Sequence, residues 1–146
     1  MKSIDANEIP PQPAAPPNVV RLPLGLLGFE QIKEYALLAN PQEKPFAWLR
    51  VADDKSLAFV VIDPFVVLPE YKPDIPQSDV EFLGLKEAAD ALLLGIVTVH
   101  SDRHATMNLK GPVVINRHTH TGKQVIIANA SDYSVEHRLP MAEAVA

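Results

Sequence analysis

The stretch Leu57-Ala58-Phe59-Val60-Val61-Ile62 decides the fold, because every position is apolar and the residues are mostly β-branched or aromatic. A strand with one solvated face alternates apolar and polar residues. A continuous run instead indicates a strand that is covered on both faces or that lies in a strongly curved sheet. Val113-Val114-Ile115 shows the same pattern. A closed or nearly closed small barrel would account for both segments.

Further short apolar runs follow one another along the chain, separated at close intervals by Pro, Gly, Asn and Asp. The polar residues 53–56 predict an antiparallel hairpin between two of these runs, and Thr121-Gly122 predicts another between the last two. The pattern is typical of an all-β sandwich or barrel. We therefore predict a mainly all-β fold, a small antiparallel β-barrel-like domain. The expected strands are Val19–Leu22, Tyr35–Leu38, Phe46–Val51, Leu57–Ile62, Leu92–His100, Val113–Arg117 and Lys123–Ala128.

Helix is expected only in one or two short turns. Ser78 and Glu81 have the spacing of a capping box, in which the hydroxyl and the carboxylate satisfy free amides at the start of a helix. A second turn is expected around Lys86–Ala91. These turns would be minor additions to the sheet.

A chain of 146 residues is long enough for one domain with a real core. Five of its 14 prolines fall in residues 10–17, where restricted φ angles and missing amide donors prevent a helix interior or a strand ladder. We predict a disordered Pro-rich arm over residues 1–17, a single β-barrel domain over residues 18–140 and a flexible tail over residues 141–146.

The composition excludes several classes of function. The absence of cysteine rules out disulfides, thiolate nucleophiles and thiolate metal ligands. No secretory signal and no apolar run of membrane-spanning length is present, so we expect a soluble cytoplasmic protein without membrane contact. A net charge of −5 disfavours direct nucleic-acid binding but suits a basic protein partner.

Histidines are the strongest candidates for chemistry. His118 and His120 would share one face of a strand, so that both could bind one metal ion with His100 or His104 as a third ligand. No HExxH motif, paired carboxylate or cysteine stands nearby, and the solvated tip of a hairpin explains residues 117–122 better. We expect no metal site, and keep a metal-dependent small-barrel enzyme as the alternative function. The five histidines are His100, His104, His118, His120 and His137.

No other catalytic set emerges. Ser101, Asp102 and His104 are triad residue types, but their adjacency in sequence is not triad geometry, and no GxSxG motif exists. Gly25-Leu26-Leu27-Gly28 leads into Phe29-Glu30 instead of opening a helix, which argues against a phosphate-binding loop. We therefore expect no catalytic residues and no cofactor.

Two proline-containing segments suit contact with a partner. In residues 63–73 the prolines keep amides out of a ladder and could hold Phe65 and Tyr71 at the surface, although an edge strand whose aromatic side chains cap the core is equally consistent. Residues 107–112 join two strands through a Gly-Pro kink. This kink could place Asn108 and Leu109 at a rim, or it is a bulge in which Asn108 bonds its own backbone.

Four segments together resemble one protein family, FliW. The order and spacing of these segments match the family, and the resemblance runs from roughly Val19 to His137. The family usually has proline where this chain has Leu27 and alanine where it has Gly111, and the Pro-rich arm is additional. The segments are Gly25-Leu26-Leu27-Gly28-Phe29-Glu30, Leu57-Ala58-Phe59-Val60-Val61-Ile62-Asp63-Pro64-Phe65, Asn108-Leu109-Lys110-Gly111-Pro112-Val113-Val114-Ile115-Asn116 and Gln124-Val125-Ile126.

The resemblance implies a β-barrel-like flagellar assembly factor that is not an enzyme. Such a protein binds newly made flagellin in the cytoplasm and also binds CsrA, the translational repressor of flagellin messenger RNA. The two complexes compete, so flagellin synthesis is coupled to secretion. We expect a monomer when free, and we expect partner contacts first from Met107, Asn108, Leu109 and Pro112 and then from Phe65, Glu70 and Tyr71.

Overall fold

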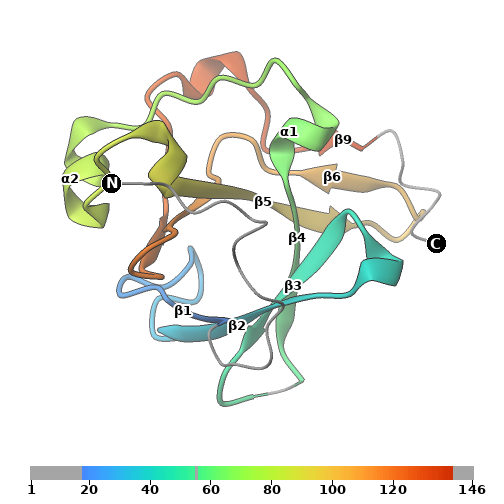
Figure 1. The fold of residues 1–146 in the computed structure, drawn as a ribbon. Coiled ribbons are helices and arrows are strands. Elements are labelled where there is room, and N and C mark those ends of the chain that lie inside the picture. Colours follow the sequence, from blue (N-terminus) through green and yellow to red (C-terminus); the bar gives the residue numbers. More distant parts are fainter. Residues whose placement is uncertain (1–17, 55, 140–146) are drawn as a thin grey trace.

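The computed structural model describes residues 18–54 and 56–139. Within this part of the chain the strands form a mainly antiparallel sheet in the order β1-β2-β3-β4-β5-β6-β9, and β7 and β8 extend from another part of β5 (Figure 1). The strands are β1 (Val19–Arg21), β2 (Glu34–Ala39), β3 (Phe46–Val51), β4 (Ala58–Ile62), β5 (Ala91–Val99), β6 (Ala105–Met107), β7 (Val113–Asn116), β8 (Gly122–Gln124) and β9 (His137–Arg138). The predicted all-β class is confirmed.

Both predicted hairpins are confirmed. Strands β3 and β4 pair antiparallel, with Phe46 opposite Ile62 and Arg50 opposite Ala58. Strands β7 and β8 pair antiparallel, with Val113 opposite Gln124. The turn of the second hairpin lies before the predicted Thr121-Gly122, because Gly122 is already the first residue of β8 and pairs with Ile115.

Strand β5 organises the sheet. One of its edges pairs with β4, while the other pairs with β7 over Ala91–Leu94 and with β6 over Val97–Val99. Two hydrophobic cores lie on the two faces of this arrangement. Val114 belongs to one core, whereas its neighbours Val113 and Ile115 belong to the other. The continuous apolar runs are thus covered on both faces, as predicted.

The sheet is barrel-like but does not close through a strand ladder. Its two ends approach each other where Arg21, at the end of β1, forms a single parallel bridge with Thr121. The Arg21 amide donates to the carbonyl oxygen of His120 at 2.9 Å. Figure 1 shows the strands curving around a common interior, with the helical segments at the periphery.

Helical segments are short, and one helix begins differently from the prediction. The α2 helix starts after Pro76 without a side-chain cap, so Ser78 does not cap it. Glu81 instead accepts a hydrogen bond from Gln77 Nε2 at 3.2 Å. The helices are α1 (Pro64–Val67) and α2 (Gln77–Leu83), with single 3₁₀ turns at η3 (Pro41–Glu43), η4 (Ala88–Asp90) and η5 (Ala130–Asp132).

The α1 helix replaces the edge strand considered for residues 63–73. Asp63 caps it by accepting a hydrogen bond from the Phe65 amide at 2.9 Å, and Pro64 stands at its first turn, where a missing amide costs nothing. The short strands β6 and β9 were not predicted, and β8 ends at Gln124 instead of Ala128. A strand of two or three residues is too short to show the alternation by which strands are recognised in a sequence.

The boundaries of the folded domain remain predictions. The predicted arm over residues 1–17 and the predicted tail over residues 141–146 lie outside the described residues. Among the helices of the described part, none is both long and apolar enough to cross a membrane.

Candidate functional site

An open pocket of about 310 Å³ lies between the loop that follows β1, the middle of the sheet and the segment that precedes β9. Phe59 and Ile96 contribute apolar surface from β4 and β5, and Thr98, Thr106 and His100 contribute polar groups. Two strongly exposed apolar side chains line it, Leu27 at 64% and Val135 at 52% exposure. The lining residues, which we call the groove, are Leu26, Leu27, Phe59, Ile96, Thr98, His100, Thr106, Asn108, Gln124, Val135 and Glu136.

The loop over residues 22–30 presents Leu27 at the groove through two tight turns. Gly25 and Gly28 both adopt positive φ angles, 68° and 89°, which only glycine adopts at low cost. The Phe29 amide donates to the Leu26 carbonyl at 2.7 Å, so Leu26 points inward with 2% exposure while Leu27 points outward. The loop is tied to the sheet where Phe29 packs edge-on against Phe59, with ring centroids 5.0 Å apart.

The segment over residues 107–112 packs mainly into the interior of the protein. Met107 and Leu109 are 0% and 1% exposed, and Pro112 is buried. Asn108 accepts hydrogen bonds from the Lys110 and Gly111 amides, both at 3.0 Å, so it does hold its own backbone. Asn108 is also the one residue of this segment that lines the groove. Leu109 does not lie at a rim, because it belongs to the core.

The segment over residues 63–73 contributes one aromatic side chain to the surface and one to the core. Phe65 is 41% exposed and Glu70 is exposed, whereas Tyr71 is 2% exposed. The Tyr71 hydroxyl donates to the Leu109 carbonyl at 2.7 Å, and burial raises the pKa of this phenol. Tyr71 thus joins the two segments selected from the sequence, but it does so inside the protein.

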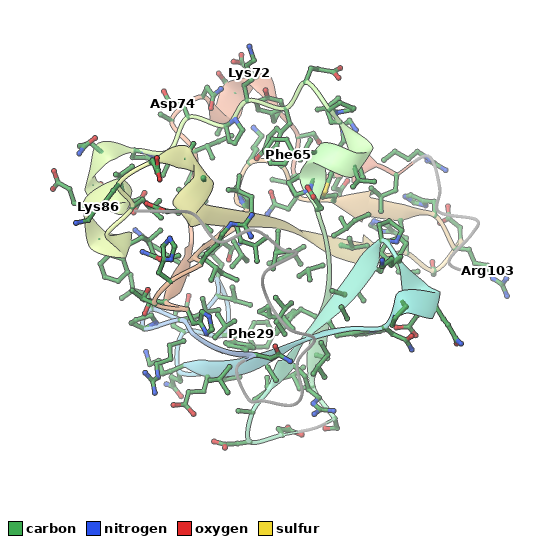
Figure 2. The ribbon with its side chains drawn as sticks, in the orientation of Figure 1. Phe29, Phe65, Lys72, Asp74, Lys86 and Arg103 are labelled. Carbon is green, nitrogen blue, oxygen red and sulfur yellow. The ribbon has the colours of Figure 1, made fainter. Side chains whose placement is uncertain are left out.

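Figure 2 shows that the α1 segment is separate from the loop that follows β1: Phe65 lies on α1 in the upper half of the view, whereas Phe29 lies well below it, near the strands β2 and β3. The partner-contact role assigned to the seven selected residues stays a prediction. Their placement shows that Met107, Leu109, Pro112 and Tyr71 can reach a partner only if the surrounding core opens.

The histidines do not assemble a metal site in the described part of the chain, where no three metal-ligating side chains converge. His100 and His104 stack with ring centroids 4.3 Å apart, and His100 Nε2 lies 2.9 Å from Thr106 Oγ1. His104 pairs with Asp102. His120 is exposed at the hairpin tip, as the solvated-tip interpretation expects, and His137 is half-buried in β9.

His118 is held by a buried carboxylate. Its Nε2 lies 2.9 Å from Asp90 Oδ1, and the other oxygen of Asp90 accepts the Lys86 and Glu87 amides at 2.9 and 3.0 Å. The Lys86 amide and then His118 hold the pKa of Asp90 below its ordinary value. This pair fixes the turn before β5 to the β7–β8 loop, so its role is structural.

Most groove residues were not selected as site residues from the sequence. The sequence predicts partner contact only for Asn108 among them, although Leu26, Leu27, Phe59 and Gln124 also stand within the segments that carry the family resemblance. A usable signal was therefore present in the sequence, since all four resembling segments contribute residues to the groove. Their convergence becomes visible only once the strands are placed.

Comparisons with known proteins all indicate one family. The family described as FliW protein matches residues 4–139. A flagellar assembly factor FliW of Leptospira interrogans is 40% identical over 129 residues, covering 87% of this chain and 85% of that protein. A second flagellar assembly factor FliW, from Moorella thermoacetica, is 36% identical over 126 residues, covering 85% and 79%.

A solved structure gives the same result at the level of the fold. The crystal structure of a flagellar assembly factor FliW superimposes with a TM-score of 0.74 at 36% identity, covering 83% of this chain and 84% of that one. From its sequence, its fold and this coverage, the chain belongs to the FliW family of flagellar assembly factors.

Proposed function

We propose that this flagellar assembly factor binds flagellin in the cytoplasm and, when flagellin is absent, binds and antagonises CsrA. The observation that carries the proposal is the convergence of all four family-resembling segments on one open groove. Segments that are far apart in sequence but meet at a surface are expected where a common partner binds. The proposal assigns flagellin to the groove.

The shape and composition of the groove support a protein partner. Exposed apolar groups surrounded by polar ones are typical of protein interfaces, whose central anchors contribute most of the binding free energy. Leu27 is the best placed anchor, because its loop is already ordered by the Leu26–Phe29 turn. A preformed loop loses little conformational entropy on binding.

The proposed CsrA complex is supported by charge. The chain carries a net charge of −5, which favours encounter with a basic RNA-binding protein and opposes the approach of RNA phosphates to that protein. Competition between the two partners would release CsrA when flagellin accumulates. If charge repulsion keeps RNA away from CsrA, the inhibition of CsrA should weaken as the salt concentration rises, because salt screens the repulsion.

The test is capture of purified flagellin and purified CsrA from the same organism, each alone and then in competition. Mutually exclusive capture supports partner switching. Capture of flagellin alone would reduce the function to that of a chaperone, and capture of neither would reject the proposal.

The substitution Leu27→Ala tests whether flagellin binds at the groove, and Leu24→Ala is its matched control. Leu24 is 51% exposed in the same loop but does not line the groove. We expect Leu27→Ala to lose flagellin affinity and Leu24→Ala to retain it, with both proteins equally folded. Equal losses in the two variants would argue against the groove as the flagellin site.

A further inference from the structure

We propose that Gln124 is a positioning residue that holds Leu27 in place as the apolar anchor of the groove. The inference rests on the proposed function for its effect on binding, while its structural part stands independently. Gln124 would not itself supply the binding energy. It would determine where Leu27 is presented to the partner.

The geometry is a two-ended bridge. The Leu27 amide donates to Gln124 Oε1 at 2.9 Å, across a sequence separation of 97 residues. At the other end of the same side chain, Gln124 Nε2 donates to the carbonyl oxygen of Gly111 at 3.0 Å. One half-buried glutamine on β8 therefore joins the loop after β1 to the segment before β7.

Leu26 and Phe29 anchor the two sides of the turn, but the two residues between them, Leu27 and Gly28, make few contacts of their own. A Cβ placed on Gly28 would meet no atom within 4 Å, and the Gly28 amide bonds locally to Glu30 Oε2 at 3.1 Å. The side chain of Leu27 is 64% exposed, so its packing contributes little to its own position. The hydrogen bond to Gln124 therefore connects the Leu27 amide directly to strand β8.

Gly111 orients the glutamine. Its carbonyl oxygen accepts from Nε2, so the opposite end of the amide, Oε1, must face Leu27. A Cβ on Gly111 would lie 3.3 Å from Gln124 Nε2 and 3.3 Å from Ile126 Cδ1, so glycine at this position leaves the amide group its room. The bridge thus consists of the amide of residue 27, the side chain of residue 124 and the carbonyl of residue 111.

The direct test is Gln124→Met, which keeps the length and bulk of the side chain but removes both hydrogen bonds. We expect the Leu27 amide to exchange with solvent at least about tenfold faster, because its acceptor is lost. Flagellin affinity should fall about tenfold, since binding must now order the loop tip. Gln42→Met, a change of the same type at an exposed position on η3, is the matched control and should change neither quantity.

A double-mutant cycle separates positioning from a contact of Gln124 itself. If Gln124 acts through Leu27, adding Gln124→Met to Leu27→Ala should weaken flagellin binding no further than Leu27→Ala alone. Independent, additive losses would overturn the proposal. Unfolding midpoints of the single and double variants show whether the effect is local, and a native far-UV spectrum with a midpoint lowered by only a few degrees is the expected result.

The two measurements distinguish the possible failures. Unchanged Leu27 amide exchange in Gln124→Met would refute the positioning role, whatever happens to affinity. Faster exchange together with no flagellin binding by the wild-type protein would support the bridge and reject the proposed function. Faster exchange with a normal affinity would overturn the claim that the bridge matters for binding.

Discussion

Two buried tyrosines form an internal control for the hydrogen bond that supports the segment beside the groove. Tyr71 is 2% exposed and donates to the Leu109 carbonyl at 2.7 Å. Tyr35 is 0% exposed, and its hydroxyl has no hydrogen-bond partner among the described residues. Replacing each tyrosine by phenylalanine keeps the ring and removes only the hydroxyl. The two variants should therefore change stability in opposite directions.

The magnitudes follow from burial. Tyr71→Phe leaves the Leu109 carbonyl without its donor, and we expect it to cost about 2 kcal/mol of unfolding free energy. Tyr35→Phe removes a desolvated hydroxyl that gains no hydrogen bond in return, and we expect it to stabilise by about 1 kcal/mol. For a chain of this size roughly 3 °C corresponds to 1 kcal/mol. Tyr71→Phe should thus melt about 6 °C lower than the wild type and Tyr35→Phe about 3 °C higher.

Thermal melts and urea titrations of the wild type and both variants measure the difference. The urea slopes should agree among the three proteins, so that a shift in midpoint reports stability alone. A loss of stability in Tyr35→Phe similar to that in Tyr71→Phe would refute the reasoning. It would mean that the Tyr35 hydroxyl is hydrogen-bonded in solution.

Three further predictions concern the core, the loop over residues 22–30 and the loss of stability at acidic pH. Leu109→Ala should lower the free energy of unfolding, measured by urea titration, by about 3 kcal/mol, because Leu109 is 1% exposed and its truncation leaves a cavity. Any loss of partner capture by this variant must therefore be compared with the fraction of the protein that is folded. Gly25→Ala should cost about 3 kcal/mol by thermal melting, since its Cβ would lie 2.5 Å from the Glu30 Cα at a φ of 68°. The lowered pKa of Asp90 means that its stabilising effect is complete above the ordinary carboxyl pKa and is lost as pH falls through the lower folded-state pKa. Asp90→Asn should therefore reduce the acid sensitivity of the melting temperature, and an unchanged pH profile would show that the hydrogen bonds of the Asp90 carboxylate, to the Lys86 amide and to His118, contribute nothing to it.

Patterns that are local in the chain predicted much of the fold. Turn-forming residues between the apolar runs located the β3–β4 and β7–β8 hairpins, because a tight turn is specified by its own few residues. Val113-Val114-Ile115 showed that β7 is covered on both faces, since an apolar residue at every position leaves no solvated side. The family resemblance added the expected architecture and led to the assembly-factor class.

The candidate site could not be located in this way. The sequence by itself determined which residues are apolar, where the turns fall and which strands are buried, because those properties depend on period and local conformation. Only the tertiary structure decided that Tyr71 and Leu109 point into the core while Leu27 points out, and that Gln124 meets a loop 97 residues away. Burial and long-range hydrogen bonds depend on which surfaces the folded sheet brings together, and a short Pro- or Gly-containing segment has no periodicity from which its inward side can be read.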